Sequence, residues 1–163
     1  DTHFRATKRV IRYVKGTLIF GIKFYANKKY VWQGYSDSDW GGSSNDMKST
    51  SSYCFNLSSR VFSRCSKKKE IVAQSMAEVE LIPVTTAANQ ALWLRKLLPD
   101  INLMQENCTE VFVDNQEAIA ISNNPIFHGK TKHFNIKLFI LREAQKEGLV
   151  GLKYCKILKD QLG

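Results

Sequence analysis

The stretch "TEVFVDNQEAIAISNN" (residues 109–124) decides the fold class, because a strand passes directly into a helix within it. The short apolar run 109–114 is rich in β-branched and aromatic residues and predicts a buried strand that ends at Asp114. Residues 115–124 predict a short helix, closed by Asn-Asn-Pro. A strand followed by a helix indicates a crossover, and therefore a sheet that contains parallel strands.

The chain before this stretch predicts antiparallel strands. Residues 17–26, 29–36, 50–57 and 60–66 each have strand-like composition, and Ser58-Ser59 separates the last two as a hairpin turn. Helical spacing covers residues 3–16, 75–98 and 131–148, and residues 149–155 predict a final strand. In the long helix, Trp93 and Leu97 are expected on the core face. The order of elements predicts an α/β domain in which a mixed sheet is packed by helices.

Charge and composition narrow the classes of partner. The 163 residues carry a net charge of +9 and are 44% hydrophobic, which is typical of one globular domain that favours polyanions. Nucleic acid is the first candidate partner and an anionic membrane surface the second. No stretch reaches the roughly 18 apolar residues of a membrane span. The four cysteines form no CxxC pair, so we expect reduced, mostly buried thiols in an intracellular protein.

Three acidic residues fall where a metal site could form. Asp37 and Asp114 end predicted strands, and Glu80 lies near the start of the long helix. Ligands gather at the carboxyl ends of strands in α/β sheets. Three converging carboxylates require a counter-charge, which Mg²⁺ or Mn²⁺ supplies, and two such ions would support phosphodiester hydrolysis. The alternative is that each aspartate only forms a turn or caps a helix.

Several ordered motifs carry a resemblance to a known family. The segments "GYSDSDWGGSSNDMKSTSSYCFNL", "CSKKKEIVAQSMAEVELI", "ANQALWLRKLL", "VFVDNQEAIAISNNPIFHGKTKHFNI" and "LKYC" resemble, in order, the ribonuclease H domain of copia-type retrotransposon Pol polyproteins. "ATKRVIRYVKGT" is similar to the tail of the preceding reverse transcriptase region. The resemblance assigns residues 1–26 to that tail or connection region, and 27–163 to a ribonuclease H-like domain truncated at its C-terminus.

The resemblance implies a ribonuclease H-like fold, with three antiparallel strands, two parallel additions and flanking helices. The implied activity is hydrolysis of the RNA strand of RNA–DNA hybrids during reverse transcription, with two Mg²⁺ or Mn²⁺ ions. The family's acidic ligands match Asp37, Glu80 and Asp114, and a fourth acid is expected after residue 163. The implied partners are the hybrid and the reverse transcriptase domain of the same polyprotein, with no membrane. The implied location is cytoplasmic, in a virus-like particle, or nuclear.

Basic and hydroxyl side chains near the expected substrate side are candidates for phosphate contacts. The alternative is that they are merely solvated surface residues. The candidates are Lys48, Ser49, Thr50, Lys67, Lys68, His128, Lys130 and Lys132.

Departures from the family pattern keep other functions open. Arg64 stands where the family usually has tryptophan, and Pro83 follows Glu80 by three residues. Proline inside a helix removes a hydrogen bond and clashes with the preceding turn, so the helix either tolerates Pro83 or begins near it. Both departures are compatible with an inactive nucleic-acid-binding module or a decayed transposon remnant.

Overall fold

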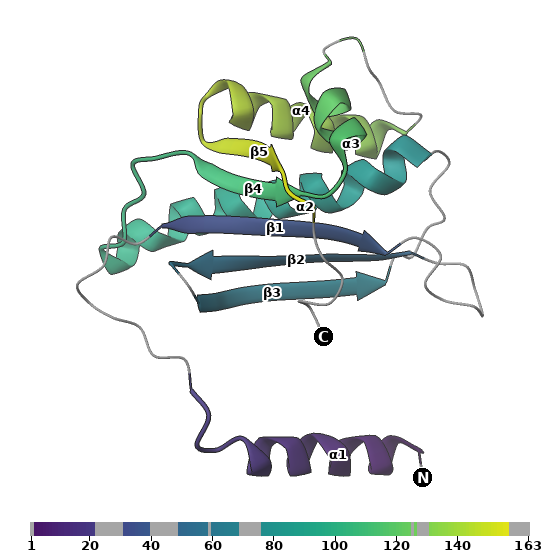
Figure 1. Cartoon of the computed structure of the whole chain (residues 1–163), viewed down its shortest axis with the longest axis vertical. Helices are drawn as coiled ribbons and strands as arrows, with labels where there is room; N and C mark the ends of the chain where they lie inside the picture. The colour runs from purple at the N-terminus through teal and green to yellow at the C-terminus, as the bar shows by residue number, and fades with distance from the viewer. Residues whose placement is uncertain are drawn as a thin grey trace.

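A computed structural model describes residues 2–21, 31–39, 49–58, 60–68, 76–124, 126 and 131–156, and Figure 1 shows its arrangement. Its centre is a five-stranded sheet in the order β3-β2-β1-β4-β5. β1 pairs antiparallel with β2, and β2 with β3, whereas β1–β4 and β4–β5 are parallel. The expected mixed sheet is therefore confirmed. The strands are β1 (Trp32–Asp39), β2 (Thr50–Leu57), β3 (Arg60–Lys68), β4 (Thr109–Val113) and β5 (Val150–Tyr154).

Two of the helices begin at residues whose side chains cap them. The Asn115 side chain accepts a hydrogen bond from the Ala118 N–H at 3.0 Å, and Thr131 accepts one from the Phe134 N–H at 3.3 Å. Gly148, with φ of +69°, follows the last helix in the left-handed conformation that glycine tolerates. The helices are α1 (Thr2–Gly16), α2 (Met76–Leu97), the 3₁₀ helix η1 (Leu98–Ile101), α3 (Gln116–Asn123) and α4 (Lys132–Lys146).

The core lies between one face of the sheet and α2. Burial alternates along β4, so Val111 and Val113 face the core, and Phe55 of β2 is fully buried beside them. Toward the sheet, α2 presents small side chains, among them the fully buried Ala87 and Ala88. Small residues let the helix approach closely. α3 and α4 pack against α2 and β5, which completes the layer of helices.

Two predicted features of the chain are wrong. The expected strand 17–26 is absent from its described part: residues 17–21 contain turns that extend from α1, with Thr17 N–H bonded to Val14 O and Phe20 N–H to Thr17 O. Residues 22–26 lie outside the described residues. Trp93 and Leu97, expected in the core, are 54% and 41% exposed. α2 is apolar on more than one side. Its contact with the sheet buries Val84, Ala88 and the residues in phase with them, and leaves Trp93 and Leu97 exposed.

Pro83 lies inside α2, seven residues after its start, and is fully buried. The alternative in which the helix begins near Pro83 is therefore wrong. Its neighbours reinforce the turn: the hydroxyls of Thr85 and Thr86 donate to the Ile82 carbonyl at 3.0 and 2.7 Å. The helix thus carries Glu80 in regular geometry, one turn before the proline.

The cysteines are less buried than expected. All four are reduced; Cys108 is exposed, and the other three are half-buried. Cys108 and Cys155 lie just outside β4 and β5, Cys54 shares the sheet face of Tyr35, and Cys65 is the partner of Tyr53 on the outer strand β3. None of the helices in the described ranges has the length and apolarity needed to cross a lipid bilayer.

Candidate active site at the carboxyl end of the sheet

Two of the predicted acidic residues meet at one edge of the sheet. In the parallel β1–β4 pair, Ser36 lies opposite Val113, and the next residues along the two strands are Asp37 and Asp114. Asp114 directly follows β4, whereas Asp37 lies inside β1 and pairs with Ser52 of β2, so the expectation that Asp37 ends its strand is wrong. Adjacent strands run about 4.8 Å apart, so the two aspartates lie on neighbouring strands toward the same edge of the sheet. Asp37 is half-buried and Asp114 exposed. The expectation that their strands are parallel and adjacent is confirmed.

Glu80 enters from the helix layer. α2 starts at the same side of the sheet as the carboxyl ends of β1 and β4, and it packs on β1 (Figure 1). Glu80 is half-buried between the buried Val79 and Leu81. Across the part of the chain that the structure describes, no group of three or more His, Cys, Asp or Glu side chains lies close enough together to hold a metal ion. Among the residues that the structure describes, the fold therefore brings the two aspartates onto neighbouring strands but does not close a three-carboxylate set.

The donor chemistry of these residues fits a hard divalent cation. Carboxylate oxygens are the ligands that Mg²⁺ and Mn²⁺ prefer. Asp37 and Asp114, on neighbouring parallel strands, supply such oxygens. The role of Glu80 remains a prediction.

A groove of about 320 Å³ opens beside Asp37 on the sheet face away from α2. Its lining includes Tyr35, Cys54 and Arg64, and register places Cys54 opposite both Tyr35 and Arg64. Burial raises the pKa of the Cys54 thiol, and the Arg64 charge partly opposes that rise. Burial also raises the pKa of Tyr35, with smaller contributions from Cys155 and Cys54.

An aromatic pair forms the floor next to this groove. The rings of Tyr35 and Phe112 stack with centroids 5.2 Å apart and an interplanar angle of 19°. Their strands are neighbours, and the two residues are direct partners in the register. Of the two rings, Tyr35 lines the groove, together with Asp37 and Arg64.

Sequence reasoning did not assign a site role to Arg64. It treated the residue as a departure from a family pattern, although Arg64 shares the groove with Asp37. The signal was present in the hairpin 50–66: once Cys54 is paired with Arg64, both side chains point to the same face as Tyr35. Only the register, which the sequence leaves open, makes that assignment.

The candidate phosphate contacts are partly gathered at the same edge. Thr50 lies opposite Lys68, and Lys67 opposite Ser51, at the ends of β2 and β3 nearest the Asp37 end of β1. Both lysines are exposed, Thr50 is half-buried and Ser49 is 8% exposed. Lys132 begins α4 and is exposed. Lys48, His128 and Lys130 lie outside the described residues.

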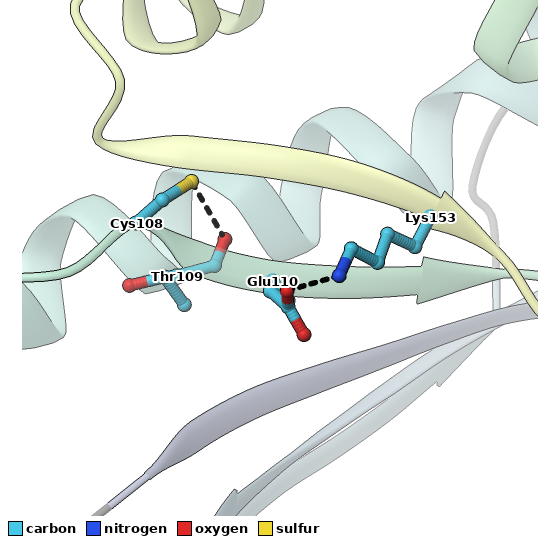
Figure 2. Close-up of polar contacts among 4 residues, drawn as sticks. All are labelled: Cys108, Thr109, Glu110 and Lys153. Atoms are coloured by element: carbon cyan, nitrogen blue, oxygen red, sulfur yellow. Dashed lines mark hydrogen bonds and ion pairs between the residues drawn. The ribbon is translucent and has the colours of Figure 1, made fainter.

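The opposite end of the sheet is occupied by structural contacts. Glu110 near the start of β4 forms an ion pair with Lys153 of β5, and the Cys108 thiol lies 3.8 Å from the Thr109 carbonyl oxygen (Figure 2). Arg95 holds the loop before β4, donating to the carbonyls of Asn107 and Gln105 at 2.7 and 3.0 Å. The Glu110 carboxylate is thus bound to Lys153, and Glu110 lies at the end of the sheet far from Asp37.

Solved structures with the same arrangement define the fold. LC11-RNase H1, isolated from compost by a metagenomic approach, matches with a TM-score of 0.52 at 13% identity, over 81% of this chain and 87% of that one. The crystal structure of prototype foamy virus protease-reverse transcriptase (native) matches with a TM-score of 0.54 at 13% identity, over 83% of this chain and 18% of that one. The protein therefore has a ribonuclease H-like fold.

The sequence relatives of this chain are much longer proteins. The chain is homologous over nearly its whole length to copia-type Pol polyproteins. It is 31% identical over 162 residues to the retrovirus-related Pol polyprotein from transposon RE2 of Arabidopsis thaliana, which covers 99% of this chain. It is 33% identical over 156 residues, 93% of this chain, to that from transposon TNT 1-94 of Nicotiana tabacum. The chain spans 11% of the length of each relative. No protein-family model matches it.

Proposed function

We propose that this domain hydrolyses the RNA strand of RNA–DNA hybrids during retrotransposon reverse transcription, in a reaction that depends on Mg²⁺ or Mn²⁺. The observation that carries the proposal is that Asp37 and Asp114 each directly follow the last register pair, Ser36 and Val113, of the adjacent parallel strands β1 and β4. Homology to Pol polyproteins supports this function over other reactions of acidic metal sites.

The roles that we propose for individual residues follow from their charge and position. Asp37, Glu80 and Asp114 would hold a two-ion site, with a fourth acid from beyond residue 163. When bound, such ions activate water and stabilise the leaving oxygen of a phosphodiester. Lys67, Lys68 and Lys132, exposed around this edge, would bind the backbone phosphates of the hybrid. Ser49, Thr50, Lys48, His128 and Lys130 are proposed as further contacts.

The proposal extends to the setting of the domain. Residues 1–26 would belong to the preceding reverse transcriptase region, and 27–163 to the ribonuclease H-like domain. The reverse transcriptase domain of the same polyprotein would be its partner. The reaction would then occur inside the cell, in a cytoplasmic virus-like particle or in the nucleus.

A cleavage assay tests the proposed activity. The chain is incubated with a hybrid labelled on its RNA strand, with Mg²⁺, Mn²⁺ or EDTA, and products are resolved on a denaturing gel. We expect metal-dependent cleavage that falls about 100-fold or more in Asp37→Asn, because a ligand is lost while the side-chain volume is kept. Glu110→Gln is the matched control, because Glu110 is bound to Lys153 away from this edge. Cleavage that survives in EDTA or in Asp37→Asn would contradict the proposal.

The second candidate function is an inactive module that binds nucleic acid. It is favoured by the absence, within the described residues, of a closed group of three metal-binding side chains. It predicts hybrid binding that weakens steeply with salt and no cleavage under any metal condition. The same assay, with binding measured in parallel, separates the two functions.

A further inference from the structure

α1 carries the largest net positive charge of the helices and strands that the structure describes. It contains five basic residues and no acid, so it contributes +5 to a chain of net charge +9. With 3.6 residues per turn, the five fall within an arc of about 120° around the helix. All five are exposed. This basic arc consists of Arg5, Lys8, Arg9, Arg12 and Lys15.

The opposite side of α1 is apolar and exposed. Phe4, Val10, Ile11 and Val14 share it, with exposed fractions of 70%, 62%, 62% and 53%. No residue of α1 is buried. The helix therefore has two sharply separated faces, and both are available for contact.

The basic arc places like charges against one another. Arg5 and Arg9, and Lys8 and Arg12, are four residues apart, and Arg12 and Lys15 are three apart. Like charges at these spacings destabilise a helix, and α1 itself has no carboxylate to offset them. A row of anions alongside the arc would remove that repulsion. The arrangement is therefore one that a polyanion stabilises.

We propose that α1 binds the phosphate backbone of the RNA–DNA hybrid through its basic arc, a contact that rests on the proposed function. Double-stranded nucleic acid presents closely spaced phosphates whose neutralisation releases counterions. Residues Arg5 to Lys15 span about 15 Å of helix, enough to follow several of them. An anionic membrane is the competing partner of a basic amphipathic helix. Homology to Pol polyproteins, whose domain here is proposed to act on nucleic acid, favours the hybrid.

A matched pair of triple variants tests the contact. Lys8→Gln, Arg12→Gln and Lys15→Gln together remove three charges from the basic arc and keep good helix formers. Arg60→Gln, Lys96→Gln and Lys146→Gln remove three exposed charges outside α1. Arg60 pairs with Leu57 at the other end of the sheet from Asp37, and Lys96 and Lys146 lie in the last turns of α2 and α4. Affinity for a fluorescent hybrid is measured by anisotropy over a range of salt. We expect the slope of log affinity against log salt to fall by about 2 to 3 in the first variant and to change little in the second. Circular dichroism checks that helix content is retained.

Each outcome has a separate meaning. The proposal would be overturned if the slope of log hybrid affinity against log salt were equal in the α1 variant and in the control variant. Loss of binding to phosphatidylserine-containing vesicles in the α1 variant while hybrid affinity is unchanged would also overturn it, because the arc would then serve a membrane. Cleavage sensitive to Asp37→Asn, measured on the same samples, reports on the proposed function separately. An α1-dependent salt slope without cleavage would retain this contact and reject the activity.

Discussion

At the residue scale, Gly34 shows how tightly the sheet is packed behind the aspartates. A Cβ at this position would lie 2.7 Å from Phe55 Cε1 and 3.2 Å from Val111 Cγ2. Both neighbours are fully buried, so neither side chain can swing aside into solvent. Gly34 therefore lets β1 pass between its neighbours three residues before Asp37.

Replacing Gly34 with alanine should destabilise the domain. We expect Gly34→Ala to lower the free energy of unfolding by about 1–3 kcal/mol, because the added methyl overpacks the core. Urea denaturation followed by tryptophan fluorescence measures the change. Gly21→Ala is the control, since no atom lies within 4 Å of a Cβ there. Equal stability of the two variants would show that Phe55 and Val111 relax without cost.

At the element scale, α3 is held at its C-terminal end by α4. Arg142 donates from Nε to the Ser122 carbonyl at 3.0 Å and from Nη2 to the carbonyls of Ile121, at 3.2 Å, and Asn124. The last carbonyls of a helix lack partners within it, and the guanidinium supplies them. Burial lowers the pKa of Arg142, although arginine stays charged. This clamp fixes α3, which begins two residues after Asp114.

Arg142→Lys tests this clamp, because it keeps the charge and removes the planar fork. We expect a loss of about 1–2 kcal/mol in the free energy of unfolding, since the compact ammonium on a shorter side chain cannot reproduce the planar fork whose two nitrogens reach the three carbonyls. Arg60→Lys, at an exposed position, should change stability by less than about 0.5 kcal/mol. Chemical denaturation of both variants provides the measurement. A loss in Arg142→Lys no larger than in Arg60→Lys would contradict the role given to Arg142.

The elements also show where sequence reasoning is strong. The strand 50–57 and the crossover 109–124 follow from local patterns, because alternation, β-branched residues and caps all indicate the same structure. The strand expected at 17–26 is wrong in its described part because a short apolar run does not separate strand from turn. Trp93 was misplaced because α2 is apolar on several sides, and only tertiary contact decides which side is buried.

At the scale of the whole molecule, the candidate site depends on the arrangement of the strands and on how α2 packs over the sheet. The placement of Asp37 and Asp114 on neighbouring parallel strands follows from strand order, which the crossover pattern predicts, and from register, which the sequence leaves open. The approach of Glu80 depends on the rotation and depth of α2 over the sheet, which no local pattern specifies. The groove with Arg64 likewise appears only when three strands are in register. Candidate residues could thus be chosen from sequence, but their mutual geometry could not.

The central claim is that these acidic residues bind divalent metal together, and Mn²⁺ binding tests it most directly. Mn²⁺ is titrated into the wild-type chain and into Asp37→Asn, Glu80→Gln and Asp114→Asn, with free ion followed by electron paramagnetic resonance. Glu110→Gln serves as control. We predict saturable binding that weakens about 10- to 100-fold in each of the three variants and is unchanged in the control. Saturable binding that none of the three substitutions weakens, or no saturable binding by the wild-type chain, would contradict the account.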